Sequence, residues 1–103
     1  MRDLAKVEIL RVGGATEEHH VGKHILIDWI TKMIGAPGAL DTVNLRDGRV
    51  MLVDDTGLVD GRPRNAAATA LYAAVCFRRT GRELPPDAFI AGDVALAMDE
   101  DFS

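Results

Sequence analysis

The chain contains a single cysteine, Cys76, so it cannot form an internal disulfide. Aromatic residues are also scarce, with one tryptophan, one tyrosine and three phenylalanines, and the core must therefore consist mainly of aliphatic side chains and alanine. No run approaches the roughly 18 apolar residues of a membrane-spanning helix, and no basic start followed by an apolar run indicates a signal peptide. We therefore expect a cytoplasmic protein with no membrane partner.

Positive charge is in deficit as well. The net charge is −4 at pH 7, which makes nucleic acid an unexpected partner because phosphate backbones attract positively charged surfaces. The last acidic residues gather at 99–101, and we expect residues 99–103 to form a short solvated tail.

A length of 103 residues suffices for one core, so we predict a single α+β domain over residues 1–103.

The sequence lacks the motifs of common enzymes. It has no Walker loop, no dinucleotide-binding glycine run, no H-E-x-x-H and no C-x-x-C. No nucleophile is paired with a base, since serine occurs only at Ser103 and neither Thr69 nor Cys76 has an adjacent base in sequence. We therefore expect a protein without catalytic residues and without a cofactor.

Three histidines fall close together and require separate consideration. His20 and His24 have the i,i+4 spacing of two ligands on one helix face, but Gly22 lies between them and no cysteine is near. We therefore interpret them, with His19, as exposed residues at a helix start and expect no metal site. A role as pH switches remains open.

Asp54 and Asp55 could hold Mg²⁺ with a phosphate, but turn chemistry is the favoured interpretation.

Apolar periodicity predicts four strands and two helices. The first strand covers residues 6–12 and the last covers 89–98, and a hairpin covers 40–54. The helices cover residues 23–34, ended by Gly35, and 65–79, ended by Gly81. Residues 15–22 are polar and irregular and are predicted to form a loop.

The hairpin register follows from its turn. Asp47-Gly48 is the dipeptide that a two-residue type I′ turn favours. A turn centred there sets Leu45 opposite Val50 and Val43 opposite Leu52, with all four side chains on one face.

The element order is βαββαβ, a ferredoxin-like arrangement in which a four-stranded sheet carries both helices on one face. Alanines in the second helix would let it lie close to the sheet. The inward face of that helix is expected to consist of Ala67, Ala70, Leu71, Ala74, Val75 and Phe77.

The segment G-R-P-R-N that precedes the second helix combines features of an anion site. Asn65 is a favoured N-cap residue, and Pro63 fixes the backbone just before it. The guanidinium groups of Arg62 and Arg64 should therefore lie near a helix N-terminus, whose free N–H groups attract anions. The alternative is a capped helix with solvated arginines.

The order of these features resembles the small proteins grouped as domain of unknown function 3846, which are encoded largely by phages, plasmids and other mobile elements. The resemblance is carried by V-M-L-V-D-D-T-G, G-R-P-R-N-A-A-A-T-A-L-Y and F-I-A-G-D-V-A-L-A, and it runs from Val7 to Ala97. Its most specific parts are Asn65 with Ala68-Thr69, and Ile90-x-Gly92. The resemblance implies a mobile-element accessory protein and supplies no catalytic residues.

Two functions follow as hypotheses. In the first, the candidate ligand-binding residues Arg62, Arg64, Asn65 and Thr69 hold an anionic small molecule, for example a nucleotide signal sequestered by a counter-defence protein. In the second, a sheet edge or the exposed face of the first helix docks on a host or phage protein without any ligand. Either function is compatible with a homo-oligomer.

Overall fold

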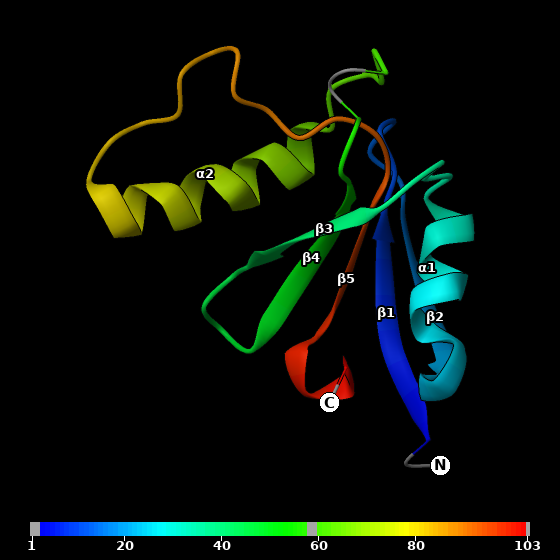
Figure 1. The fold of residues 1–103 in the computed structure, drawn as a ribbon. Coiled ribbons are helices and arrows are strands. Elements are labelled where there is room, and N and C mark those ends of the chain that lie inside the picture. Colours follow the sequence, from blue (N-terminus) through cyan, green and yellow to red (C-terminus); the bar gives the residue numbers. More distant parts are fainter. Residues whose placement is uncertain (1–2, 58–59, 103) are drawn as a thin grey trace.

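The computed structural model describes residues 3–57 and 60–102 as an α+β fold (Figure 1). The first helix is preceded by a 3₁₀ turn, Lys23–Ile25, and the chain's last described segment, Asp99–Phe102, is a second 3₁₀ turn. The regular elements are β1 (Leu4–Leu10), β2 (Thr16–Gly22), α1 (Leu26–Met33), β3 (Leu40–Asn44), β4 (Arg49–Asp54), α2 (Ala66–Thr80) and β5 (Val94–Met98).

The sheet has five strands in the order β2-β1-β5-β4-β3, and every neighbouring pair is antiparallel. The prediction of four strands is wrong because residues 16–22, expected to be a loop, form the edge strand β2. Both faces of this strand are largely polar, so its sequence lacks the alternation that identifies a half-buried strand. Its full-length pairing with β1 is what makes it a strand.

The two helices lie on opposite faces of the sheet, whereas the ferredoxin-like prediction placed both on one face. Leu26 and Ile30 of α1 pack with Val7 and Ile9 of β1 in one core cluster. Ala68 and Val75 of α2 belong to a second cluster, formed with the alternate residues of β4 and β5: Met51, Val53, Val94 and Leu96. Because both faces of the central strands are covered, β4 and β5 are apolar almost throughout.

The hairpin of β3 and β4 has a register one residue away from the predicted one. Val43 pairs with Met51, and the N–H of Leu45 donates to the carbonyl of Arg49 at 3.0 Å, which leaves a loop over residues 46–48. Asp47 stabilises this wider loop by accepting from the N–H and the side chain of Arg49. Because β4 is buried on both faces, its apolar pattern does not fix the register of the hairpin. With the observed register, Val43 and Val50 lie on opposite faces of the sheet.

The second helix begins and ends as the sequence predicts, with Asn65 as the N-cap and Gly81 in the left-handed conformation at the C-cap. Its inward face differs from the prediction. Val75 is buried and Leu71 half-buried, but the other predicted members are exposed: Ala67, Ala70, Ala74 and Phe77. The alanines therefore lie mainly on the outer side of α2, where they leave space beside the helix.

The acidic segment after β5 is attached to the rest of the fold. Asp101 forms an ion pair with Lys23 at 3.3 Å, and the half-buried Phe102 packs against the α1 core cluster. Ser103, the last residue of the predicted tail, lies outside the described residues. Within residues 3–57 and 60–102, no helix is both long enough and apolar enough to cross a membrane.

Candidate functional site

Arg62 of the predicted anion site is engaged within the protein. Its Nε atom lies 2.8 Å from Oδ2 of Asp54, a carboxylate whose side chain is 1% exposed. Its other guanidinium nitrogens donate to the carbonyls of Ile34, at 3.0 Å, and Gly35. The guanidinium thus stabilises the C-terminal end of α1, where unpaired carbonyls favour a cation.

Asn65 is fully buried and its side chain makes three hydrogen bonds. Its Oδ1 atom accepts from the N–H of Ala68 at 3.1 Å, which is the predicted cap. Its Nδ2 atom donates to the carbonyls of Leu10 at 2.9 Å and Gly92 at 3.0 Å. One side chain therefore joins the start of α2 to the ends of two other segments.

Thr69 is buried one helical turn after Asn65, and its hydroxyl also bonds within the protein. The hydroxyl oxygen accepts from the N–H of Ile90 at 3.0 Å and lies 3.4 Å from the carbonyl oxygen of the same residue. Thr69 and Asn65 together hold the segment that leads into β5 against α2.

Arg64 differs from these three residues because its guanidinium is exposed. The group lies over the ring of Phe89, with its Cζ atom 5.5 Å from the ring centroid. The backbone of Arg64 forms an antiparallel bridge with Ala91. Among the described residues, the Arg64 guanidinium forms no ion pair.

A groove of about 580 Å³ runs beside α2 and includes Arg64 at one end. Its helical wall comes from the stripe Thr69, Ala73 and Phe77, with Ala74 and Arg78 beside it. Its other wall is the coil after the helix, namely Glu83, Leu84, Pro85, Pro86 and Ala88. The small side chains of the alanines are the reason that space remains between the helix and this coil.

Phe77 and Arg78 are exposed residues of this groove. Phe77 is 53% exposed, which is unusual for a large aromatic side chain. Arg78 donates one hydrogen bond to the carbonyl of Leu45 at 3.3 Å, and among the described residues it forms no ion pair. Glu83 is the carboxylate among the lining residues and opposes the charge of the arginines.

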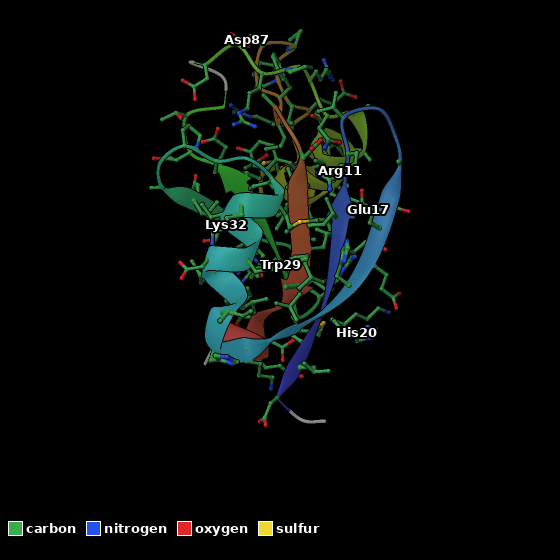
Figure 2. The ribbon with its side chains drawn as sticks, turned by 90° about the vertical axis from the view of Figure 1, so that its right-hand side faces the viewer. Arg11, Glu17, His20, Trp29, Lys32 and Asp87 are labelled. Atoms are coloured by element: carbon green, nitrogen blue, oxygen red, sulfur yellow. The ribbon has the colours of Figure 1, made fainter. Side chains whose placement is uncertain are left out.

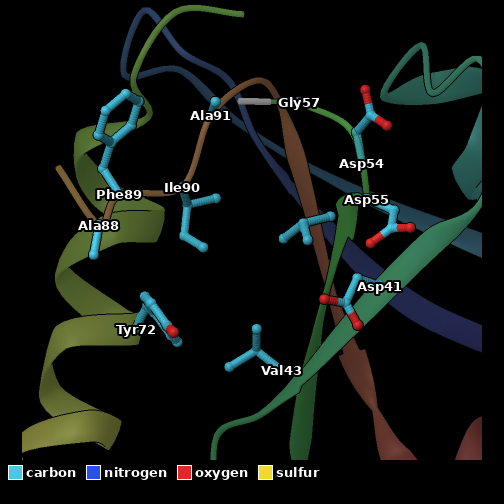
Figure 3. A pocket seen from close by; sticks show the side chains of 11 residues that line it. Asp41, Val43, Asp54, Asp55, Gly57, Tyr72, Ala88, Phe89, Ile90 and Ala91 are labelled. Atoms are coloured by element: carbon cyan, nitrogen blue, oxygen red, sulfur yellow. The ribbon is translucent and has the colours of Figure 1, made fainter. Parts of the chain in front are cut away.

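A second pocket of about 240 Å³ lies on the other side of α2, between this helix and β3 (Figure 3). Tyr72 and Val43 face each other across it, and Asp41 and Asp55 contribute carboxylates to its lining. Cys76 and burial raise the pKa of Tyr72. The negative charge of its lining disfavours an anion here.

Sequence reasoning missed a polar network at the turn between β1 and β2 (Figure 2). Arg11 forms two hydrogen bonds with Glu17, at 2.7 and 3.1 Å, and also contacts Asp93 at 2.9 Å and the carbonyl of Met33 at 3.0 Å. These bonds raise the pKa of Arg11 and lower that of Glu17 to about 2. The partners of Arg11 lie up to 82 positions away from it along the chain, so no local pattern indicates the network.

The histidines do not share a helix face. His20 lies in β2 and His24 in the following 3₁₀ turn. His19 contacts Glu17 at 3.0 Å and packs edge-on against Trp29, with 5.0 Å between ring centroids. Residues 3–57 and 60–102 contain no group of three or more histidine, cysteine or acidic residues placed to hold a metal ion.

Comparison of the chain with protein-family models, with curated proteins and with solved structures finds no match.

Proposed function

We propose that this chain is a non-enzymatic binding protein that holds an anionic ligand in the groove beside α2. The observation that carries the proposal is the presence of the exposed Arg64 and the exposed ring of Phe77 in one groove. Guanidinium groups bind phosphate and carboxylate in a bidentate manner, and an exposed aromatic ring offers a stacking surface. A volume of about 580 Å³ lies within the range of small-molecule sites.

The proposed site overlaps only partly with the site expected from sequence. Arg64 and Thr69 line the groove, whereas the polar groups of Arg62 and Asn65 are engaged within the protein. A ligand would therefore contact the outer face of α2 rather than its N-terminus. The Thr69 hydroxyl is bonded to Ile90, so the groove offers no activated nucleophile, which favours binding over catalysis.

A nucleotide has both chemical features that the groove would recognise, namely phosphate oxygens and a flat ring system. The family resemblance supports a more specific proposal. In it, the chain is an accessory protein of a phage or other mobile element and sequesters a nucleotide signal in the host cytoplasm. The binding proposal itself rests on the groove and does not depend on that origin.

Calorimetric titration of the full chain with ADP and with inorganic phosphate tests the proposal. We expect ADP to bind more tightly than phosphate, and Arg64→Gln to weaken ADP binding at least tenfold. Arg79→Gln is the control, because it removes an equal charge from an exposed position of α2 that does not line the groove. Equal losses in Arg64→Gln and Arg79→Gln would contradict a site in the groove.

Docking of a protein partner is a second candidate function. The observation that favours it is the exposed ring of Phe77, because aromatic side chains are enriched in protein–protein interfaces. If this second function is correct, the groove binds a segment of a host or phage protein.

A further inference from the structure

We infer that the chain pairs with a second copy of itself along the edge strand β2, as an antiparallel two-fold dimer in which the two sheets join. The inference goes beyond the proposed function, because no residue of β2 lines the groove beside α2. It is carried by the direction of the backbone groups of β2 and by the charges of its exposed face.

Alternate residues of β2 direct their backbone groups away from β1. At the two ends of the β1–β2 ladder, the N–H of Lys23 donates to the carbonyl of Asp3 at 2.8 Å, and the N–H of Arg11 donates to that of Ala15 at 2.9 Å. Hydrogen-bonded and non-hydrogen-bonded pairs alternate along an antiparallel ladder, so the odd-numbered residues of β2 bond to β1. The even-numbered residues therefore present their N–H and C=O groups to the outer edge of the sheet (Figure 2).

The edge at β2 is more open than the edge at β3. In β3 the N–H of Leu45 donates to Arg49, and the same alternation turns the N–H of Thr42 outward, where Oδ1 of Asp41 accepts from it at 2.9 Å. Among the described residues, no side chain bonds to the backbone of β2 in this way. The strand β2 also has seven residues against five in β3, so it offers a further strand the longer edge.

The exposed face of the β1–β2 pair carries like charges side by side. His19 packs on α1, so its neighbours Glu18 and His20 lie on the opposite face of the sheet. There the register sets Glu18 opposite Glu8 and His20 opposite Lys6, which makes one acidic row and one basic row. Like charges directly opposite each other are unfavourable. The diagonal contact of Lys6 with Glu18, at 3.4 Å, compensates little because both side chains are more than half exposed.

A two-fold axis at His19 joins the acidic row of one copy to the basic row of the other. In that register, Glu18 of each copy lies opposite His20 of the second copy. An imidazole donates an N–H to a carboxylate whether it is neutral or protonated. An axis at Glu18 would instead set two carboxylates opposite each other, and an axis at His20 would set two imidazoles opposite each other. The charges of the strand therefore select the axis at His19.

The backbone groups of β2 fit the same register. Glu18 and His20 are even-numbered, so the groups that they direct outward form a hydrogen-bonded pair with the second copy. His19 then lies opposite its own copy in a non-hydrogen-bonded pair. Side-chain and backbone complementarity thus coincide at the same residues, and the isologous pairing closes at two chains.

Sedimentation velocity of the full chain over a range of concentrations tests the dimer. We expect a species of twice the mass of the chain, whose share increases with concentration. Glu18→Lys and His20→Glu should each raise the dissociation constant at least about tenfold, because each sets like charges opposite each other in the dimer. Within one copy, both changes improve the pairing with Glu8 and Lys6, so thermal melting should show both variants folded.

Charge exchange separates specific pairing from a general effect of charge. The double variant Glu18→Lys/His20→Glu should dimerise as the parent chain does, and so should an equimolar mixture of the two single variants. Asp87→Lys is the matched control, because it makes the same charge change as Glu18→Lys at an exposed position in the coil after α2. It should leave the dissociation constant unchanged.

Cross-linking tests the register. The Cα atoms of a non-hydrogen-bonded pair lie about 4.5 Å apart, a separation that a disulfide spans. In a Cys76→Ala background, His19→Cys should therefore form a disulfide-linked dimer on mild oxidation. Thr16→Cys is the control, because it keeps Glu18 and His20 while its two copies lie far out of register. Equal cross-linking at both positions would overturn the register.

Two further results would overturn the dimer itself. One is a chain that remains a monomer at every concentration up to about 1 mM. The other is a dimer that Glu18→Lys and His20→Glu leave intact, because the copies would then associate through another surface. Loss of dimerisation in both single variants, with recovery in their mixture, supports pairing along β2.

Discussion

The guanidinium of Arg62 pairs with the carboxylate of Asp54 at 2.8 Å, and this carboxylate is almost completely buried at the end of β4. The Oδ1 atom of Asp54 accepts from the N–H and the hydroxyl of Thr56. Oδ2 lies 2.8 Å from Nε of Arg62 and has no hydrogen-bond partner among the described residues. Arg62 in turn donates to two carbonyls at the end of α1. The pair therefore connects the sheet to the first helix through a carboxylate that is almost completely buried.

Removal of the arginine from this pair should destabilise the fold strongly. Arg62→Met leaves the Asp54 carboxylate buried without its cation, and we expect the free energy of unfolding to fall by about 3–5 kcal/mol. Urea denaturation measures this loss. Arg64→Met, which removes an equal charge from an exposed position, should change stability by less than about 1 kcal/mol.

The double variant Arg62→Met/Asp54→Asn identifies the origin of that loss. Asparagine is uncharged at this position, so the double variant should recover part of the stability that Arg62→Met loses. A double variant as unstable as Arg62→Met would assign the loss to the missing carbonyl contacts rather than to the unpaired charge.

The amide of Asn65 supports a separate prediction. Asn65→Asp keeps the capping oxygen but has no donor for the carbonyls of Leu10 and Gly92, and it places an unpaired carboxylate at a fully buried position, so we expect a loss of more than about 3 kcal/mol. Asn65→Ala loses the cap, worth about 1 kcal/mol, as well as the donors, but it introduces no buried charge and should lose less stability than Asn65→Asp. If Asn65→Asp were as stable as the parent chain in thermal and urea unfolding, the amide contacts would be energetically unimportant.

The sequence predicts the elements whose signals are local. Asn65 and Gly81 bound α2 as expected, because caps depend on neighbouring residues only. The strand β2 and the hairpin register were not predictable in this way, because both depend on pairing with distant segments. The two faces of the sheet could not be assigned either, since β4 is apolar at successive positions and fits a core on either side.

The candidate site shows the same division between local and distant effects. The sequence places Arg62 and Arg64 in one loop, two positions apart, but Arg62 turns toward Asp54 and α1, while Arg64 lies over Phe89. Residues far along the chain determine this difference. The groove was also hidden from sequence reasoning, because its second wall is the coil after α2, which has no regular pattern.

Gly92 is a position where a single methyl group should be destabilising. Its φ of +84° favours glycine, and an added Cβ atom would lie 2.9 Å from Cδ of Arg62. We expect Gly92→Ala to lower the free energy of unfolding by about 2–4 kcal/mol, from backbone strain and displacement of Arg62. Gly14→Ala is the control for strain alone, because Gly14 has a φ of +96° and no atom within 4 Å of the added methyl group. Equal losses in the two variants would show that Arg62 adjusts without cost.

The network around Glu17 predicts how stability depends on acid. Hydrogen bonds from Arg11, and then from His19, lower the pKa of Glu17 from 4.5 to about 2. Because the folded state binds the proton less readily than the unfolded state, this contribution is fully present above about pH 4.5 and is lost as pH falls toward 2. In Glu17→Gln the contribution is absent at every pH, so its stability should decline less steeply between pH 4.5 and 2 than that of the parent chain.

Urea unfolding at a series of pH values measures these slopes. Glu18→Gln is the matched control, because it removes a carboxylate from the neighbouring position, where the partner is the exposed Lys6 rather than Arg11. A Glu17→Gln variant with the same acid dependence as the parent chain would show that the Arg11 network does not hold Glu17 ionised in the folded state. A shallower slope in Glu17→Gln, not matched by Glu18→Gln, would assign the acid sensitivity to the turn between β1 and β2, where Arg11 joins the hairpin to α1 and to Asp93 before β5.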